Sequence, residues 1–366
     1  MRIGHLGQHG FALIRLDAVL MALLGVLMVM GLGVLYSAGE QALSLVFNQA
    51  IRLGVGLLAL VVLAQVPKRL WLVWAPFLYA LALIMLLAVE WFGVGRGAQR
   101  WLDFGLIWFQ PSEAMKIALP LMLAAYLSTR PLPPSVLTTL ASVLLVAVPV
   151  ALILIQPDLG TAILIGTGGL AVVFLAGLRW RMIVGLAAVV MAALPLMWLN
   201  LRDYQKNRIL TFLDPERDPL GQGWNIIQSK IAVGSGGWSG TGWLSGSQSH
   251  LEFLPEPHTD FIFSVLAEEF GWVGVMAVLI VYALIIFRCL QLASDCSDPF
   301  VRLVIGGVVV SFFVYVVVNV SMVSGLLPVV GVPLPLMSYG GTSAVTILAG
   351  FGLIQGLHSR RRFMGH

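Results

Sequence analysis

Long apolar runs separated by short polar segments dominate this chain from end to end. Ten of them are long enough, at roughly 20 residues, to cross the hydrocarbon core of a bilayer as an α-helix. The ten runs cover residues 16–37, 46–66, 70–91, 112–129, 136–156, 159–177, 180–200, 261–288, 301–325 and 343–358. We therefore predict an all-α polytopic membrane protein with about ten transmembrane helices, in which residues 1–366 form a single integral membrane domain.

The composition favours a membrane protein over a soluble one. Hydrophobic residues make up 59% of the chain and charged residues 10%, whereas about a quarter of an ordinary soluble domain is charged. No A-x-A-like cleavage site stands out after the first apolar run, so we interpret that run as a retained span rather than a signal peptide. Cys289 and Cys296 lack the spacing of a metal-binding pair, and we interpret them as inert thiols.

The basic residues predict how the helices are oriented. If the N-terminus lies inside, most Lys and Arg residues fall in inside segments, and the short outside loops hold only Arg96 and Arg100. Cytoplasmic loops of membrane proteins carry this excess of positive charge, so both termini are predicted to be cytoplasmic. Acidic residues outside or at the outer ends of spans include Asp103, Glu113, Asp158, Asp203, Asp214, Glu216, Asp218, Glu252, Glu256 and Asp260. Polar chemistry is therefore expected on the outer face.

Two outer segments are predicted to do more than connect helices. Residues 201–260 form one large extracytoplasmic loop between spans seven and eight, which is too long for a plain connector. Residues 326–342 are apolar but contain Pro328, Pro333 and Pro335, so a continuous helix is not expected there. Non-helical backbone at membrane depth must be buried in protein or line a cavity. We therefore predict a re-entrant-like outer loop over residues 326–342.

Four ionisable side chains in or at the ends of spans are candidate functional residues, because such groups are costly in a membrane. Each also has a purely structural interpretation. Arg52, in span two, can extend its side chain to the outer interface. Glu113 and Lys116 are three residues apart in QPSEAMK and can form a structural ion pair. Asp158, in QPDLGT, can cap span six.

The long outer loop contributes a basic cluster and a glycine-rich stretch. Arg202, Lys206 and Arg208 follow span seven directly and can form a cationic patch that suits an anionic headgroup or pyrophosphate, or simply a solvated face. The stretch from Gly234 to Gly246 has no phosphate-loop spacing. We expect its glycines to allow tight turns beneath a bound headgroup, and its two tryptophans to lie at the interface or stack on sugars.

The stretch HLEFLPEPHTDFIF, residues 250–263, permits three interpretations. A metal site is disfavoured because Pro255 and Pro257 break helical spacing and H-E-x-x-H is absent. Asp260 directly precedes an apolar run and can cap the next helix. A carboxylate held at a fixed depth at the outer end of a span also suits a general base. The five ionisable residues of the stretch are His250, Glu252, Glu256, His258 and Asp260.

Four short motifs together resemble the SEDS family of bacterial cell-wall polymerases. They occur in the order of that family, and the likeness covers essentially the whole chain. The motifs are RWLDFG…FQPSEAMK (100–116), QPDLGTA (156–162), LPEPHTDFIFSVLAEEFG (254–271) and VPLPLMSYGGTS (332–343). The stretch NIIQSKIAVGSGG…GTGWLSGSQSHLEFLPE resembles the elongation branch of the family, RodA-like, more than its division branch.

The resemblance implies a peptidoglycan glycosyltransferase that polymerises lipid II at the outer face of the bacterial cytoplasmic membrane during cell elongation. It also implies a class B penicillin-binding protein as the transpeptidase partner, beside other membrane proteins of the elongation complex, and no nucleic-acid partner. Asp260 matches the catalytic aspartate of the family's HTDF motif. Glu113, Lys116 and Asp158 match the charged positions of two other motifs.

These residues suggest an inverting displacement by a single step. Asp260 would take the proton from the acceptor hydroxyl as general base. Arg52, Lys116 and Arg208 would neutralise the departing pyrophosphate, with Lys206 as a further substrate-binding candidate.

Some assignments stay open at this stage. A divalent cation such as Mg²⁺ could bridge Glu113 or Asp158 to the phosphates, and Ser338 and Tyr339 in the SYGG turn are further substrate-binding candidates. A lipid II flippase also fits ionisable residues inside spans, although the outward bias of the acids disfavours a carrier. A non-enzymatic scaffold would leave the outer acids and bases unexplained.

Overall fold

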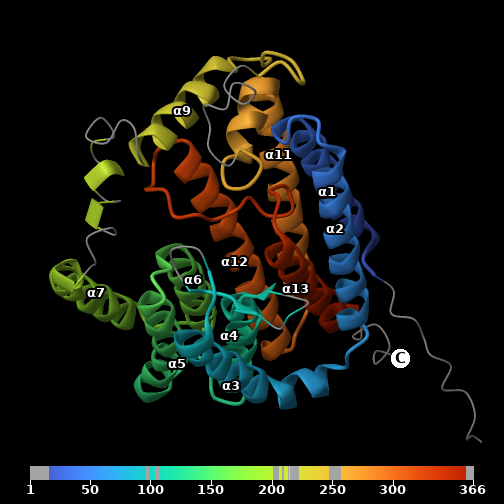
Figure 1. The fold of residues 1–366 in the computed structure, drawn as a ribbon. Helices are drawn as coiled ribbons and strands as arrows, with labels where there is room; N and C mark the ends of the chain where they lie inside the picture. The colour runs from blue at the N-terminus through green and yellow to red at the C-terminus, as the bar shows by residue number, and fades with distance from the viewer. Residues whose placement is uncertain are drawn as a thin grey trace, which may run out of the picture.

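The computed structural model describes residues 16–95, 99–103, 105, 108–200, 206–207, 210–212, 214, 222–246 and 257–359. A helix lies at each of the ten predicted spans, which confirms the all-α fold class (Figure 1). These helices are α1 (Ala18–Ala38), α2 (Leu43–Ala64), α3 (Lys68–Phe92), α4 (Pro111–Ser128), α5 (Val136–Ile155), α6 (Leu159–Leu175), α7 (Trp180–Asn200), α11 (Ile262–Ser294), α12 (Pro299–Val323) and α13 (Gly341–Ser359). Among the described residues, six of the ten, namely α1, α2, α3, α5, α11 and α12, are long and apolar enough to cross a membrane by length and composition.

The local sequence explains where many of these helices start. Polar side chains accept the free amides of the first turn in four of them, at Asp17, Ser135, Asp158 and Asp298. Such caps satisfy backbone donors that have no partner within the helix. In α4, a proline at the first position starts the helix without leaving an unused amide.

Small residues allow the helices to pack closely at the centre. Helix α12 packs against α4, α6 and α11, and α13 packs along α2 (Figure 1). A Cβ added at Gly307 of α12 would lie 2.4 Å from Val172 and 3.0 Å from Pro120. On α13, a Cβ at Gly352 or Gly356 would meet the backbone of α2 at 2.5 and 2.6 Å. This small-xxx-small pattern is typical of tight helix contacts in membranes.

The helix ends predicted to lie inside meet at one end of the bundle. Arg288 of α11 donates to both carboxylate oxygens of Asp17, at 3.1 and 2.6 Å, and the Asp17 amide donates to Gln355 of α13 at 2.7 Å. Lys68 pairs with Asp298 at the same set of ends. These contacts join the start of α1 to the end of α13, as expected if both ends lie on one side of the membrane.

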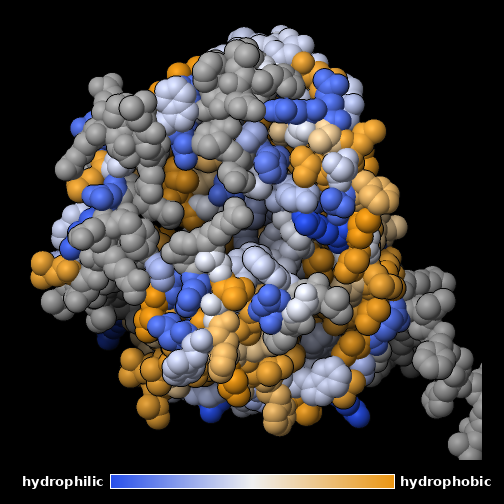
Figure 2. Space-filling model, in the orientation of Figure 1, coloured by the Kyte–Doolittle hydropathy of each residue, from blue (hydrophilic) through white to orange (hydrophobic). Residues whose placement is uncertain are grey.

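Apolar side chains form much of the outer surface, as a surrounding bilayer requires. Figure 2 shows hydrophobic side chains along the lower and right margins of one face, with hydrophilic and intermediate side chains gathered towards its middle. Exposed apolar residues occur on every side of the predicted spans, for example Phe47, Phe77, Leu137 and Phe287. Cys289 and Cys296 are both buried free thiols.

Three features were not predicted. Helix α9 (Gln222–Ser235) lies within the long outer loop and packs across α11 and α12. A short antiparallel pair, β1 (Leu102–Asp103) and β2 (Trp108–Phe109), precedes α4. Helix α11 is broken at Gly271, where φ is 60° and ψ is −160°. Helix α9 and the break at Gly271 depend on contacts between distant parts of the chain, whereas the strand pair is a local hairpin too short to show a periodic pattern.

The break in α11 gives the glycine-rich segment a different role from the predicted one. The carbonyls of Glu268 and Glu269, freed by the break, accept from the amides of Thr241 and Gly242, each at 3.0 Å. On the other side of the break, the Trp272 amide donates to a carbonyl of the same segment at 2.9 Å. Residues 236–242 thus replace the lost helical hydrogen bonds, as backbone buried at membrane depth requires.

The two aspartate caps at the inside end generate a prediction about stability. In Asp17→Asn the cap of α1 remains but the bidentate pair with Arg288 is lost, so we expect the free energy of unfolding to fall by about 1–2 kcal/mol. The matched control is Asp298→Asn, which also keeps a cap but loses a more exposed pair, with side chains 38% and 34% exposed, at a cost of at most about 1 kcal/mol. Thermal unfolding of the purified proteins in detergent measures both. A larger loss for Asp298→Asn would contradict the assignment.

Candidate active site

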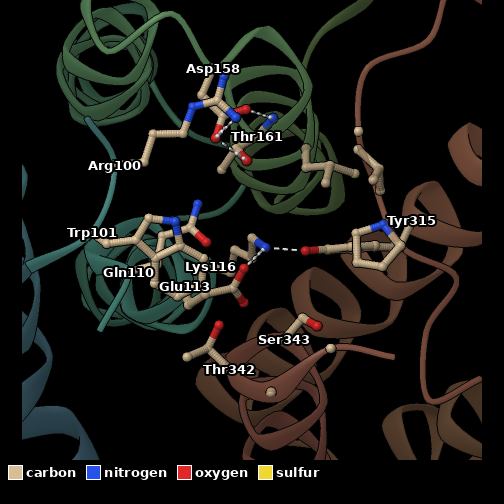
Figure 3. Close-up of a pocket in the computed structure, with 16 residues that line it drawn as sticks. Arg100, Trp101, Gln110, Glu113, Lys116, Asp158, Thr161, Tyr315, Thr342 and Ser343 are labelled. Atoms are coloured by element: carbon tan, nitrogen blue, oxygen red, sulfur yellow. Dashed lines mark hydrogen bonds and ion pairs between the residues drawn. The ribbon is translucent and has the colours of Figure 1, made fainter. Parts of the chain in front are cut away.

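A polar cavity of about 230 Å³ lies where several helices end on the predicted outer side. Its walls come from the N-terminal turns of α4, α6 and α13, from Tyr315 of α12, and from residues 331–333 of the connection between α12 and α13 (Figure 3). The cavity therefore collects residues that lie more than 200 positions apart in the sequence. It is formed where the sequence predicted the outer polar chemistry.

Lys116 of α4 lies in the middle of the cavity and has two polar partners (Figure 3). Its ammonium pairs with Glu113 at 2.5 Å and donates to the Tyr315 hydroxyl. The ammonium also lies 4.6 Å from the centre of the Tyr315 ring, a distance at which a cation and an aromatic face attract. The predicted ion pair therefore forms, and it lines the cavity.

Glu113 has a carboxylate oxygen that the ion pair with Lys116 does not use. The residue is 4% exposed, and its second carboxylate oxygen, Oε2, has no hydrogen-bond partner among the described residues. A buried carboxylate oxygen without a partner is costly. The pair thus leaves one acceptor available beside the cavity.

Asp158 caps α6 and also faces the cavity. One of its oxygens accepts from the Thr161 amide at 3.2 Å, and the other accepts from the Thr161 hydroxyl at 2.9 Å. Arg100 approaches the second oxygen at 3.6 Å and donates to the Pro157 carbonyl at 2.7 Å. The cap interpretation of Asp158 is confirmed, and the carboxylate is held by Thr161 of its own helix and approached by Arg100 from the segment before β1.

Three helix N-termini open on this cavity, those of α4, α6 and α13. Each N-terminus carries partial positive charge and backbone amides without a helical partner. The first residues of α13, Gly341 to Ser343, are small, and all three line the cavity. Converging helix N-termini beside a lysine and an arginine form an environment that suits an anion such as a phosphate.

The connection between α12 and α13, residues 324–340, is non-helical, and residues 334–338 within it are buried. Gln49 of α2 holds its second half, because the Gln49 amide donates to the Ser338 carbonyl at 3.1 Å and accepts from the Gly340 amide at 3.3 Å. The Ser338 hydroxyl accepts from the Leu334 amide at 2.8 Å, and Ser338 is 3% exposed. Ser338 therefore shapes the loop from within rather than facing the cavity.

Asp260 lies beside this loop at the rim of the cavity. A Cβ added at Gly331, which lines the cavity, would lie 3.5 Å from Oδ2 of Asp260. Gly331 has φ of +73°, a conformation that favours glycine. The cap interpretation of Asp260 is wrong, because the cap position of α11 is Phe261, which makes no side-chain cap hydrogen bond. The carboxylate instead lies against a residue that forms the cavity wall.

Arg52 and Tyr339 form a second group on the far side of the same loop. The Arg52 guanidinium lies 4.3 Å from the centre of the Tyr339 ring. The Tyr339 amide donates to the His258 carbonyl at 2.8 Å, and the two rings meet edge to face. A Cβ at Gly341, which lines the cavity, would lie 3.4 Å from Nε of Arg52. Arg52 thus borders the cavity through the SYGG turn.

The remaining candidates lie elsewhere. Lys206 follows α7 and donates to the Leu199 carbonyl at 3.5 Å, and it is not among the residues that line the cavity. Arg208 lies outside the described residues, as do His250, Glu252 and Glu256.

The described residues hold no group of three or more His, Cys, Asp or Glu side chains that could bind a metal ion. Both oxygens of Asp158 already have partners, whereas Glu113 could supply a single carboxylate oxygen. One or two carboxylates completed by substrate phosphates suffice for Mg²⁺ in some enzymes. The residues present do not form a metal site of their own, and the bridging cation stays a prediction.

Sequence reasoning missed several residues that line the cavity, among them Arg100, Gln110, Tyr315, Thr342 and Ser343. Arg100 was assigned only as a loop charge, although it directly precedes WLDFG. The uncharged groups gave little signal, because ionisable side chains are the ones costly enough in a membrane to stand out. The two glycines before Thr342 were the sequence feature that indicated a helix N-terminus with an accessible backbone.

Comparisons with known proteins agree on one family. The FtsW/RodA/SpoVE family profile, described as cell cycle protein, matches residues 11–363. The chain is 49% identical to the peptidoglycan glycosyltransferase MrdB of Escherichia coli (strain K12), over 96% of this chain and 95% of that protein. It is 38% identical to a probable peptidoglycan glycosyltransferase FtsW of Halorhodospira halophila, over 91% and 86%.

Two solved structures are similar along almost their whole length. One belongs to a study of the structural coordination of polymerization and crosslinking by a peptidoglycan synthase complex, with a TM-score of 0.83 and 39% identity, over 96% of this chain and 99% of that one. The other is Thermus thermophilus rod shape determining protein RodA, with a TM-score of 0.73 and 32% identity over the same shares. The predicted likeness to the elongation branch is confirmed, and the chain belongs to the FtsW/RodA/SpoVE family, the SEDS family of cell-wall polymerases.

Proposed function

We propose that this chain is a peptidoglycan glycosyltransferase that polymerises lipid II into glycan strands at the outer face of the cytoplasmic membrane during elongation, with Asp260 as general base. The activity is that of the relative MrdB, to which the chain is 49% identical. One observation carries the assignment of the base. The Asp260 carboxylate lies against Gly331 in the wall of a cavity whose other walls suit an anion.

The reaction sets requirements that this arrangement meets. A hydroxyl of the acceptor sugar attacks the anomeric carbon of the donor, and the lipid pyrophosphate leaves from the opposite face. A single displacement inverts the anomeric centre and needs no carboxylate nucleophile. Asp260 accepts the hydroxyl proton as the new bond forms. The loop at Gly331 separates the base from the cations of the cavity. In the same way, the attacking hydroxyl and the leaving pyrophosphate lie on opposite faces of the anomeric carbon.

The leaving pyrophosphate requires positive charge at the place where negative charge develops. Lys116, Arg100 and the N-terminus of α13 supply it within the cavity, and Arg52 borders them across the SYGG turn. The Glu113 partner holds Lys116 in place, so little reorganisation is needed when the phosphate arrives. Arg208 and Lys206 remain candidates for contacts of the outer loop with headgroups.

A carrier mechanism is less well supported. A flippase needs polar groups that can be reached from both sides in turn. In the part of the chain that the structure describes, the charged side chains of Asp17 and Arg288, and of Lys68 and Asp298, are paired with each other at the inside end. Glu269 accepts from Ser37 of α1, and neither it nor Glu268 lines the cavity. We therefore favour an enzyme with one outward-facing site.

We further propose that the chain works with a membrane-anchored transpeptidase of the class B penicillin-binding protein type. A similar solved chain belongs to a synthase complex in which polymerization and crosslinking are coordinated. A glycan strand that leaves this cavity emerges at the outer surface, where crosslinking of its peptides must follow.

Replacing the base should abolish catalysis without abolishing binding. We expect Asp260→Asn to lower glycan-strand formation from purified lipid II by about 100- to 10,000-fold, because the amide cannot accept the proton. Lipid II affinity should stay within about twofold, since the side chain keeps its size. The control is Asp103→Asn, an exposed acid on the same face, which should retain full activity. Equal activity of Asp260→Asn and the parent protein would refute the assignment.

The Glu113–Lys116 pair can be tested as a unit. Lys116→Met should lower strand formation by about 100-fold or more, because one cation is lost from the leaving-group site. The doubly neutral variant Glu113→Gln/Lys116→Met removes the unpaired buried charge that the single change creates. If Lys116 neutralises pyrophosphate, the double variant stays inactive although its thermal stability recovers. Recovery of activity together with stability would instead show that the pair is only structural.

Sidedness can be measured by labelling two matched serines. In a background with Cys289→Ala and Cys296→Ala, we expect a membrane-impermeant maleimide to label Ser245→Cys in intact spheroplasts. Ser294→Cys should be labelled only after permeabilisation, because it lies at the end predicted to be cytoplasmic. Both serines are exposed. The reverse pattern would place the cavity on the cytoplasmic side and exclude polymerisation at the outer face.

A further inference from the structure

Asn319 is a fully buried polar side chain in the last two turns of α12. It is 0% exposed and stands in the apolar run VYVVVNV. A buried amide costs free energy unless its hydrogen bonds are made, so its partners indicate why an apolar residue does not fill the same space.

The two donors of Asn319 join two segments that are distant in sequence. Nδ2 donates to the Asp260 carbonyl at 2.9 Å and to the Val332 carbonyl at 2.7 Å. The amide oxygen, Oδ1, has no hydrogen-bond partner among the described residues. Both observed bonds therefore use the NH₂ group, and both end on backbone that no helix or strand includes.

These two carbonyls belong to the residues that place the base at the cavity. Asp260 carries the carboxylate, and Val332 follows Gly331, against which that carboxylate lies. The backbone bond from Tyr339 to His258 is a second tie between the same two segments. Asn319 is thus the side chain that sets the distance between the Asp260 backbone and the cavity wall.

We propose that Asn319 is a positioning residue for the reaction, which holds the Asp260 backbone against the loop at Val332 so that the carboxylate meets the acceptor hydroxyl. The inference rests on the proposed function, because it needs Asp260 as the base. Without the amide, the buried Val332 carbonyl and the partly buried Asp260 carbonyl both lose the donor that joins them, so the two segments are free to shift relative to each other. A shift of about 1 Å in a catalytic group can cost about a hundredfold in rate.

Asn319 differs from the other amide that holds this loop. Gln49 bonds the loop at Ser338 and Gly340, beside Arg52, and the structure gives it no bond to the Asp260 segment. Loss of Asn319 should therefore affect turnover, whereas the cavity residues on α4 and α6, which bind substrate, stay in place.

The test compares two buried amides in the full-length protein. Asn319→Ala and Gln355→Leu are purified, together with the transpeptidase partner if the parent protein requires it, and strand formation is followed over a series of lipid II concentrations. Gln355 is 2% exposed, bonds the Asp17 amide and lies at the other end of the bundle. For Asn319→Ala we expect kcat to fall at least about tenfold, with KM within about twofold. For Gln355→Leu, Tm should fall while kcat stays within about twofold.

The outcomes separate the inference from the function on which it rests. If Asp260→Asn is inactive but Asn319→Ala keeps its kcat, or loses activity only through KM, the positioning role is wrong. An equal loss of kcat in Gln355→Leu would also overturn it. If Asp260→Asn itself turns over normally, the proposed base is wrong. Should Asn319→Ala fail to fold, Asn319→Ser retains one donor, and its kcat must fall between those of the parent and Asp260→Asn for the inference to stand.

Discussion

Non-helical backbone at membrane depth has no water to bond its amides and carbonyls, and the outer half of this protein depends on how that demand is met. Residues 324–340 and the break of α11 at Gly271 both leave such groups free. Side-chain amides of α2 and α12 satisfy the first segment, and residues 236–242 satisfy the second. These hydrogen bonds tie the irregular backbone to the helices around it, and part of that backbone lines the cavity.

The need to bond this non-helical backbone also explains where glycines occur. At Gly240 an added Cβ would lie 2.0 Å from the Glu269 carbonyl, and at Gly236 it would lie 1.9 Å from the Ala267 carbonyl. Such approaches leave no room for a side chain. The glycine-rich stretch is therefore a packing surface for α11. Its tryptophans, Trp238 and Trp243, remain exposed, as expected at a membrane interface.

Local signals predicted much of the fold and part of the site. The length of the apolar runs predicted the spans. The spacing of three residues predicted the Glu113–Lys116 pair, and the position of Asp158 directly before an apolar run predicted that it caps a helix. Three features could not be predicted in this way: the hydrogen bonds of Asn319, helix α9 and the break at Gly271. Each depends on backbone groups supplied by a remote segment. Asn319 is still visible in the sequence as a single amide side chain in a run of valines. The cap prediction for Asp260 was wrong by one residue, since Phe261 occupies that position.

The distribution of charge at the cavity agrees with what the proposed base and the proposed leaving-group site each require. A carboxylate next to a free lysine would form an ion pair, and its affinity for a proton would fall. Here Lys116 already has Glu113 as its partner, and Arg100 has Asp158. Asp260 approaches the cavity from the other side of Gly331, on a segment held by α12. In the proposed mechanism, each cation keeps an acidic partner at the cavity, and the general base approaches from the other side of Gly331.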